Sequence, residues 1–329
     1  MADIHILVPV YNDWAALRQL LVEINGVAGA RAERIAVCLI DDGSATPHDL
    51  DAQTLSSLDK LAGLEIIELA SNGGHARAIA IGLSAVTAEY QGKAVLVMDG
   101  DGEDKPEDIA RLLDRFNERP DRVVVAQRRR RSEGAAFRLF YRIYKLLFRA
   151  MTGQAITFGN FCICPWPLAR RLTHMPELWS HLAGSLLRAR VAIDLLPTDR
   201  GARYAGRSQM RFTGLLQHGL GAIAVDLDRV LVRLLIALGS FIGLLALALL
   251  GIILVRLFSE VAIPGWATTA FGLVSVLLVQ SVVFAVLLLF ISLKTRNLSE
   301  AIPALRYGDY IAARHCLIGA PPKSDAGKS

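Results

Sequence analysis

Two long apolar runs near the carboxyl terminus constrain the fold of this chain most. They cover residues 234–255 and 266–293, and neither contains a charged residue. A helix needs roughly 20 apolar residues to cross a bilayer, so each run is long enough to span one. A buried helix of a soluble protein is the alternative, but two such runs in succession favour a membrane hairpin. We therefore expect two transmembrane helices within residues 229–296.

The overall composition indicates that the hairpin is joined to a soluble part. The 329 residues are 53% hydrophobic and 20% charged, and the mean hydropathy is +0.39. This is too apolar for an ordinary soluble domain and too charged for a bundle that lies wholly in the membrane. Four cysteines without a standard zinc-site spacing suit a reducing compartment.

The charges around the hairpin predict its orientation, because Lys and Arg accumulate on the cytoplasmic side of membranes. The linker at 257–265 has no Lys or Arg, although Arg256 lies at its edge. The segments that flank the hairpin are basic, with Arg229, Arg233, Lys294 and Arg296. We therefore expect a multi-pass protein of the inner (cytoplasmic) membrane, with both termini and the soluble part in the cytoplasm.

The first 130 residues alternate short apolar runs with segments of helical spacing. The pattern predicts an α/β fold with a mostly parallel, doubly wound sheet, whose ligands bind at the carboxyl ends of the strands. We place this core at 1–132, an acceptor and interfacial region at 133–228, the hairpin at 229–296 and a cytoplasmic tail at 297–329. The expected strands are 4–10, 35–40, 64–69, 94–98 and 122–126, and the expected helices are 13–24, 75–88 and 106–117.

Four carboxylates follow the fourth expected strand, among glycines: Asp99, Asp101, Glu103 and Asp104. Like charges at the end of a buried strand repel one another unless a cation neutralises them. Asp99 and Asp101 can converge on Mg²⁺ or Mn²⁺, which prefer oxygen ligands and also accept substrate phosphates. A solvated acidic turn before the helix at Pro106 is the alternative.

Polar residues also follow the other strands of the expected sheet, at the same edge. There Tyr11 can flank a nucleotide base, Asp41 or Asp42 can accept hydrogen bonds from a base or ribose, and Arg77 can approach phosphate. Each residue also has a structural explanation by itself, such as a tight turn at 41–44 or a helix cap at His75. The candidate donor-binding residues are Pro9, Tyr11, Asn12, Asp41, Asp42, Arg77 and Asp99.

The motifs of these loops resemble a known family when they are taken in order. They read PVYN, DDGS, NGGHARAIAIGL and MDGDGEDKPEDI, and they are similar to the nucleotide-diphosphate-sugar domain of family 2 inverting glycosyltransferases of the GT-A type. With the two spans, the whole chain resembles the polyprenyl-phosphate glycosyltransferases, the group of dolichyl-phosphate mannose synthase and bacterial undecaprenyl-phosphate sugar transferases. The resemblance implies transfer of a sugar from a nucleotide diphosphate-sugar donor to a polyprenyl phosphate acceptor for cell-envelope glycans, with Mg²⁺ or Mn²⁺.

The resemblance also implies roles for the acidic residues. Asp41 and Asp42 would hold the nucleoside, and the Asp99 and Asp101 pair would serve ribose, metal and diphosphate. Glu103 stands where the family often has a metal-contacting glutamine, which makes this site more anionic. Asp104 is a candidate catalytic base or orienting group, and its alternative role is a cap for the helix that begins at Pro106.

Two basic segments are candidates for binding phosphate. Arg128 and Arg131 follow the fifth strand, where the family carries an R-x-x-R-like pair, and guanidinium groups match phosphate oxygens. Arg203, Arg207 and Ser208 resemble the family's R-x-x-G-x-S-K-Y region near the acceptor phosphate, with a glutamine where the family has lysine. We expect Arg128 and Arg131 to contact the donor diphosphate or the lipid phosphate, and the second segment to contact the lipid phosphate.

One segment departs from the family pattern at the expected catalytic base. Bacterial members commonly have a D-x-G-D-F segment, but this chain has Thr157 and Asn160 at the two carboxylate positions. A phosphate monoester is largely anionic at neutral pH, because its second pKa is near 6, so it can attack without a base. A lipid hydroxyl, of diacylglycerol or a sphingoid base, is an alternative acceptor that would need one. A non-catalytic membrane scaffold is a further alternative, which the intact acidic pair argues against.

The basic excess of the chain points to lipid. Residues 135–151 combine aromatic and basic residues at helical spacing, which is typical of a helix in the membrane interface, although a helix packed on the core is the alternative. Residues 212–227 form a second, less basic segment of this kind. The net charge is +5, and much of the excess lies beside membrane segments without a nucleic-acid-binding motif. We expect the lipid bilayer and no nucleic acid as a partner, and leave a homo-oligomer open.

Overall fold

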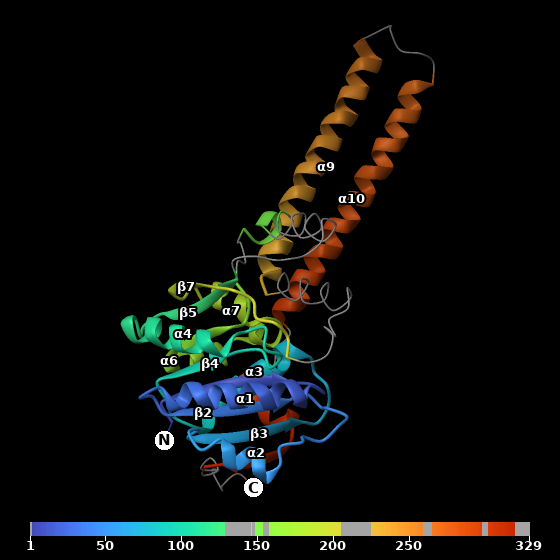
Figure 1. Ribbon diagram of the computed structural model, residues 1–329. Helices are drawn as coiled ribbons and strands as arrows, with labels where there is room; N and C mark the ends of the chain where they lie inside the picture. The colour runs from blue at the N-terminus through green and yellow to red at the C-terminus, as the bar shows by residue number, and fades with distance from the viewer. Residues whose placement is uncertain are drawn as a thin grey trace. The chain divides into compact units, whose positions relative to one another are not determined.

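The computed structural model describes residues 2–128, 146, 149–153, 158–204, 225–258, 265–297 and 302–319, with side chains except at 128 and 292–297. They belong to two compact units, which we describe separately (Figure 1). The first unit holds the described residues within Met1–Lys145, Ala155–Val225 and Ala301–Ser329. The second holds those within Leu146–Gln154 and Asp226–Glu300.

An eight-stranded sheet lies at the centre of the first unit, in the order β7-β5-β6-β4-β1-β2-β3-β8. Six strands run parallel, while β6 and β8 run antiparallel to their neighbours. This confirms the expected α/β fold with a mostly parallel sheet. The strands are β1 (Ile4–Val10), β2 (Ile35–Asp41), β3 (Gly63–Leu69), β4 (Ala94–Val97), β5 (Val123–Arg128), β6 (Cys162–Pro165), β7 (Ile193–Thr198) and β8 (Ile311–Ile318).

Helices cover both faces of the sheet, which explains why β1 is buried at every position. Successive side chains of a strand point to opposite faces. Ile6 and Val8 therefore belong to the core under α1 (Trp14–Gly29) and α4 (Pro106–Glu118), whereas Leu7 belongs to the core on the other face. That second face is covered by α3 (His75–Glu89), α6 (Trp166–Leu172) and α7 (Leu182–Arg188). Two shorter helices also belong to this unit, α2 (Ala52–Ser57) on the first face and η1 (Pro176–Trp179) on the second.

The expected elements agree closely with the observed ones in the first 130 residues. The first strand has the expected bounds, and the first helix continues to Gly29. Asp13 precedes this helix as its N-cap, but its side chain makes no capping hydrogen bond. Pro106 opens α4, as expected. The region expected to form a separate acceptor part contributes β6 and β7 to the same sheet.

The chain returns to the sheet after the apolar hairpin. Residues 303–318, within the expected cytoplasmic tail, form α11 (Pro303–Arg306), η2 (Tyr307–Tyr310) and β8, which pairs with β3. Arg314 of β8 lies 3.5 Å from Glu65 of β3 and donates to Glu89 of α3 at 2.7 Å. The segments before and after the hairpin are therefore parts of one folded unit.

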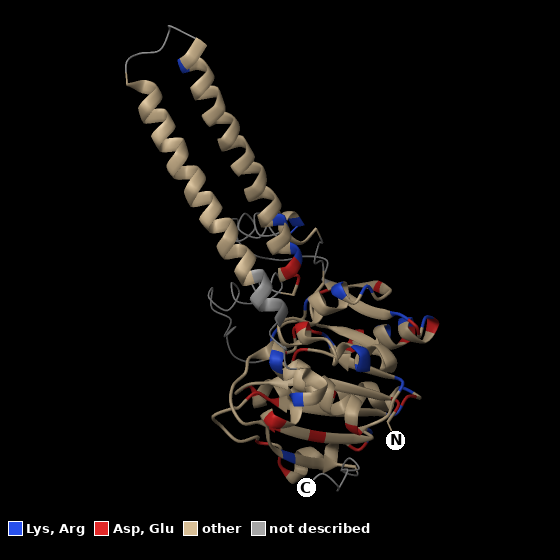
Figure 2. Ribbon diagram, turned by 180° about the vertical axis from the view of Figure 1, so that it is seen from behind, with Lys and Arg blue, Asp and Glu red and all other residues tan. Residues whose placement is uncertain are grey.

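The second unit contains two long helices that pack against each other, α9 (Leu227–Phe258) and α10 (Trp266–Asn297). Both are long and apolar enough to cross a membrane, with mean hydropathies of 2.7 and 2.8. Only 6% of the residues in each apolar window are buried, which is unlike the core helix of a soluble protein. Charged residues lie near the ends of these helices and are absent from their middle (Figure 2). These are the candidate membrane spans.

Candidate active site

The loops after β1 and β2 are tied together at the carboxyl edge of the sheet. The backbone amide of Asn12 donates to Ser44 Oγ at 2.8 Å, and the amide of Ala45 donates to Asn12 Oδ1 at 2.8 Å. Asn12 has φ of 53°, a left-handed conformation that asparagine tolerates better than most residues. Pro9 lies within β1, while the side chain of Tyr11 is exposed at this edge. Asn12 shapes the loop, and Tyr11 is open to a ligand.

The two aspartates after β2 hold backbone amides. Asp41 Oδ1 accepts from the amide of Ser44 at 2.9 Å. The two oxygens of Asp42 accept from the amides of Gly73 and Gly74, at 2.8 and 2.9 Å. Burial raises the pKa of Asp42, although the two amide bonds oppose the rise. Asp42 therefore connects its loop to the turn that precedes α3.

That turn places His75 beside the acidic tract. His75 is the first residue of α3 and Nε2 lies 3.2 Å from Asp99 Oδ1 and 3.0 Å from Asn160 Nδ2. The N-cap of α3 is Gly74, so His75 does not cap the helix. Burial disfavours the protonated ring, but the carboxylates of Asp99, Asp104 and Asp42 outweigh this effect and raise the pKa of His75. From the sequence, His75 was interpreted only as a helix cap, although its position directly after a loop at the end of a strand also indicated a place near the site.

The acidic tract after β4 is organised by hydrogen bonds to its own backbone. The amide of Asp99 donates to Asp104 Oδ2 at 3.0 Å, and the amide of Glu103 donates to Asp101 Oδ1 at 2.9 Å. Asp104 is buried, and the N-cap of α4 is Lys105. Asp104 therefore orients the start of the tract through the amide of Asp99 and does not cap the helix.

Two arginines from a distant part of the sequence pair with the tract. Arg203 Nη2 donates to Asp101 Oδ2 at 2.7 Å, and Arg200 Nη2 donates to Glu103 Oε1 at 2.5 Å. Arg203 was expected near the acceptor phosphate, but in the structure it contacts a predicted metal ligand. Its Nε is buried and has no hydrogen-bond partner within the described residues. The guanidinium group therefore retains a donor that an anionic ligand can use.

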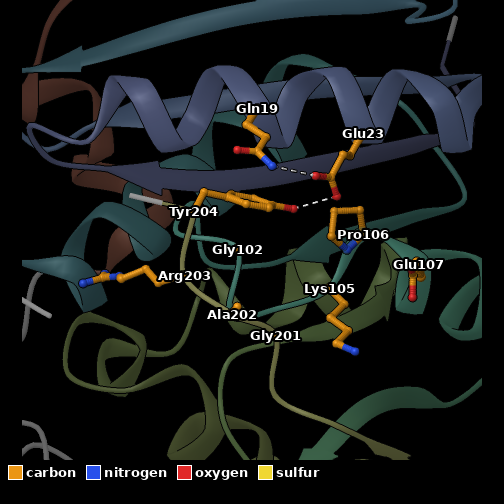
Figure 3. A pocket seen from close by; sticks show the side chains of 10 residues that line it. All are labelled: Gln19, Glu23, Gly102, Lys105, Pro106, Glu107, Gly201, Ala202, Arg203 and Tyr204. Carbon is orange, nitrogen blue, oxygen red and sulfur yellow. Dashed lines mark hydrogen bonds between the residues drawn. The ribbon is translucent and has the colours of Figure 1, made fainter. Parts of the chain in front are cut away.

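The backbone around these arginines also contacts the tract. The amide of Gly201 donates to the carbonyl of Glu103 at 2.9 Å, and the amide of Tyr204 donates to the carbonyl of Asp101 at 3.1 Å. A cavity of about 400 Å³ lies beside this segment (Figure 3). It is lined by Gln19, Glu23, Gly102, Lys105, Pro106, Glu107, Gly201, Ala202, Arg203 and Tyr204, which include none of the donor-loop residues after β1, β2 and β3.

The chemistry of the tract suits a hard divalent cation. Asp99, Asp101 and Glu103 offer carboxylate oxygens, the ligands that Mg²⁺ and Mn²⁺ prefer. Burial raises the pKa of Asp101, and the carboxylates of Asp99 and Glu103 add to the rise, so a cation is favoured here. Within the described ranges, however, no three His, Cys, Asp or Glu residues are grouped so that they could hold a metal ion. Arg203 and Arg200 engage two of the expected ligands instead.

Several expected phosphate-binding residues lie outside the described part of the chain. Arg131, Arg207 and Ser208 are among them, as are most of the two expected interfacial segments, 135–151 and 212–227. Arg128 ends β5, and only its backbone is described. Arg77 is described and exposed in the first turn of α3. The roles assigned to these residues stay predictions.

Comparison with known families identifies the fold and the class of enzyme. The family model described as "Glycosyl transferase family 2" matches residues 5–171, from β1 to α6. The chain belongs to glycosyl transferase family 2. The matched range contains the loops after β1, β2 and β3 and the whole acidic tract, so this glycosyltransferase carries its family signature where the site residues converge. The two long apolar helices α9 and α10 and the return strand β8 lie outside the matched range.

Curated relatives of this glycosyltransferase are similar over nearly its whole length. An undecaprenyl-phosphate 4-deoxy-4-formamido-L-arabinose transferase of Klebsiella pneumoniae (strain 342) is 28% identical, with 97% of this chain and 91% of that protein covered. The protein of the same name from Enterobacter sp. (strain 638) is 26% identical, with the same coverage. The similarity therefore extends beyond the sheet into the apolar hairpin.

A solved structure with a similar fold supports the architecture. Glucosyl-3-phosphoglycerate synthase from Mycobacterium tuberculosis, in complex with Mn²⁺, UDP-glucose and phosphoglyceric acid, matches with a TM-score of 0.51. The two chains are 16% identical, and 70% of this chain and 80% of that one are covered. At this identity the likeness establishes the fold alone.

Proposed function

We propose that this glycosyltransferase transfers a sugar from a nucleotide diphosphate-sugar to a polyprenyl phosphate of the undecaprenyl type, at the cytoplasmic face of the inner membrane. The observation that carries the proposal is the similarity to the Klebsiella transferase over 97% of the chain. That relative's name specifies an undecaprenyl-phosphate acceptor, and the similarity includes the candidate membrane hairpin. A membrane anchor suits an acceptor that is itself held in the bilayer.

The donor site is proposed at the carboxyl edge of the sheet. Tyr11 would flank the base, and the loop held by Asp41 and Asp42 would face the nucleoside. Asp99, Asp101 and Glu103 would hold Mg²⁺ or Mn²⁺, which when bound neutralises the negative charge that develops on the leaving diphosphate. The support for this arrangement is the convergence of these loops at one edge of the sheet and the carboxylate oxygens that the acidic tract offers as ligands.

The acceptor phosphate requires cations and needs no protein base. A phosphate monoester oxygen is already anionic at neutral pH, so it attacks the anomeric carbon while the bond from that carbon to the diphosphate oxygen breaks. The configuration at the anomeric carbon is inverted, and no proton has to be removed from the acceptor. Asn160, which has no carboxylate, is compatible with this chemistry. Arg128, Arg131, Arg203, Arg207 and Ser208 are the proposed contacts of the acceptor phosphate and the donor diphosphate, because guanidinium groups pair with phosphate oxygens in a bidentate manner.

The proposed topology is supported by the return of the chain to the sheet. β8 follows the second apolar helix and pairs with β3. The chain segments before and after the hairpin therefore belong to one folded unit. A hairpin of two spans meets this requirement, whereas a single crossing does not. The charge distribution then favours the cytoplasm as the side of the folded unit.

Lipid extraction after a labelling reaction tests the proposed function. The purified full-length protein in lipid nanodiscs is incubated with Mn²⁺, undecaprenyl phosphate and a panel of radiolabelled sugar nucleotides. We expect label in the organic phase that requires undecaprenyl phosphate and is absent with the Asp101→Asn variant. Matched reactions contain diacylglycerol or ceramide in place of undecaprenyl phosphate. Label that appears only in those reactions, or with no acceptor, contradicts the proposal.

A further inference from the structure

The 200–204 segment contacts the acidic tract through both side chains and backbone, and it is itself held by α1. We propose that Glu23 and Tyr204 are positioning residues that hold Arg203 on Asp101, so that Arg203 competes with the divalent cation for Asp101 Oδ2. The inference rests on the proposed function, because it assumes a metal-assisted donor site in the tract.

The close approach of the two backbones restricts where Arg203 can lie. A Cβ atom added at Gly201 would lie 2.3 Å from the carbonyl oxygen of Gly102. A Cβ atom added at Gly102 would lie 2.5 Å from the ring of Tyr204. Glycines at both positions therefore allow the segment to lie directly on the tract. With the amides of Gly201 and Tyr204 bonded to tract carbonyls, the side chain of Arg203 begins next to Asp101.

Tyr204 fixes the end of the segment to α1. Its hydroxyl donates to Glu23 Oε2 at 2.7 Å, and Gln19 Nε2 donates to the other oxygen of Glu23 at 3.3 Å. Tyr204 points toward Glu23, while Arg203 points in the opposite direction (Figure 3). Tyr204 also packs against the core under α1 and α4. Loss of the hydroxyl therefore loosens the segment without removing any group from the tract.

Arg203 and a metal ion at Asp101 would repel each other. Oδ1 of Asp101 accepts from the amide of Glu103, and Oδ2 accepts from Arg203. A divalent ion at Oδ2 would stand within a few ångströms of the guanidinium charge, and like charges at that distance repel strongly in a half-buried site. Binding of the metal is therefore favoured when Arg203 leaves Asp101 Oδ2.

The displaced guanidinium group has an alternative partner in the loaded site. A donor brings a diphosphate to the metal, and guanidinium groups pair well with phosphate oxygens. The unpartnered Nε of Arg203 is buried beside the tract, so a small movement is enough to offer both Nε and Nη2 to a phosphate. Glu23 and Tyr204 would thus set the balance between an arginine on Asp101 and a metal on Asp101.

Measurement of Mn²⁺ binding tests this competition without reference to turnover. Free Mn²⁺ is titrated by electron paramagnetic resonance with the full-length protein in nanodiscs and no donor. We expect Tyr204→Phe and Glu23→Ala to bind Mn²⁺ about twofold to tenfold more tightly, the size of one net hydrogen bond, and Arg203→Gln to show a gain at least as large. Glu23→Gln should resemble the unmodified protein, because its amide oxygen still accepts from Tyr204.

The controls separate a positioning role from a general effect. Arg31→Gln removes an arginine that pairs with Glu33 and Asp114, and it should leave Mn²⁺ affinity unchanged. General damage to the fold would weaken Mn²⁺ binding, so a gain of affinity cannot arise from it. Unchanged or weaker Mn²⁺ binding in either Tyr204→Phe or Arg203→Gln overturns the proposal, as does an equal gain in Arg31→Gln.

Labelling of lipid then distinguishes the two proposals. If the affinities shift as expected but no sugar nucleotide labels undecaprenyl phosphate, the competition is upheld and the proposed function fails. If labelled undecaprenyl phosphate forms but the affinities do not shift, the proposed function is upheld and the competition fails.

Discussion

Nε2 of His75 lies 3.2 Å from Oδ1 of Asp99, where the turn before α3 meets the acidic tract after β4. Asp42 holds the turn through the amides of Gly73 and Gly74. Three loops that are distant in sequence are thereby connected at the proposed donor site. The contact also gives Asp99 a histidine neighbour whose pKa is raised by nearby carboxylates, against the opposing effect of burial.

Replacement of His75 tests whether this contact supports the donor site. We expect His75→Ala to lower kcat/KM for the sugar nucleotide by about tenfold to a hundredfold, because a charge-assisted hydrogen bond contributes about 1.5 to 3 kcal/mol. His75→Gln retains a donor for Asp99 and should recover part of the loss. His174→Ala changes an exposed histidine bonded to the carbonyl of Arg170 and serves as the control. Equal activity of His75→Ala and His174→Ala would show that the contact is dispensable.

Loss of one carboxylate from the acidic tract should impair sugar transfer much more than it changes the stability of the fold. We expect Asp101→Asn to abolish sugar transfer, because one of the proposed metal ligands is lost, while the thermal midpoint stays within a few degrees of that of the unmodified protein. Burial and neighbouring carboxylates raise the pKa of Asp101, so a neutral amide relieves repulsion. Transfer assays at saturating donor, together with a thermal melt, check both halves. Full activity of Asp101→Asn would contradict the proposed role of Asp101 as a metal ligand.

The backbone conformation of the loop after β2, at the carboxyl edge of the sheet, requires glycine at position 43. It has φ of 69°, and a Cβ atom there would lie 2.8 Å from the amide nitrogen of Asn72. We expect Gly43→Ala to destabilise the protein by about 1–3 kcal/mol. Gly26→Ala is the matched control, since a Cβ atom on this helical glycine meets nothing within 4 Å, and it should stabilise by about 0.5–1 kcal/mol. Thermal melts followed by tryptophan fluorescence should shift in opposite directions, and shifts of the same sign would contradict the argument.

The ion pairs of β8 predict a pH-dependent stability defect. Arg314→Met leaves the buried Glu65 and the neighbouring Glu89 without their cation, which should cost about 3–5 kcal/mol at neutral pH. Burial already raises the pKa of Glu65, so folding favours its protonated form. The penalty for the charged carboxylate is present above that pKa and is relieved as the pH falls through it. Melts of Arg314→Met should therefore approach those of the unmodified protein on acidification.

A second substitution checks the cause of that defect. Glu65→Gln combined with Arg314→Met removes the buried charge together with its partner, and it should recover much of the stability at neutral pH. A defect in Arg314→Met that is equally large at acidic and neutral pH would indicate lost packing in place of lost charge compensation.

Reporter insertions test the orientation of the hairpin. A reporter in the 259–264 linker should be accessible from outside the cytoplasm, and one after Ser329 should be accessible from the cytoplasm, because the linker interior has no Lys or Arg. Labelling of intact cells with a membrane-impermeant reagent reads both positions. External labelling of the carboxyl-terminal reporter would contradict the two-span arrangement and also the pairing of β8 with β3.

Local patterns in the sequence determined the elements of the sheet and hairpin. The short apolar run at residues 4–10 and the helical spacing after it correspond to β1 and α1, because both patterns depend on neighbours only a few residues away. The apolar runs in α9 and α10 were recognisable for the same reason. Parallel alternation also placed Asp42, His75 and Asp99 at one edge, since strands of a doubly wound sheet end on the same side.

Only the tertiary structure decided which of these side chains meet. Arg203 reaches Asp101 across 102 positions of sequence, and β8 joins β3 after the whole hairpin has intervened. Such contacts depend on how the layers pack, and no periodic signal in either segment encodes the partner. The use of Asp42 to hold two amides, and of His75 to contact Asp99, likewise follows from loop conformations at Gly43 and Gly74. The sequence therefore determined where the proposed site lies, and the packing of distant segments decided how its charges are paired.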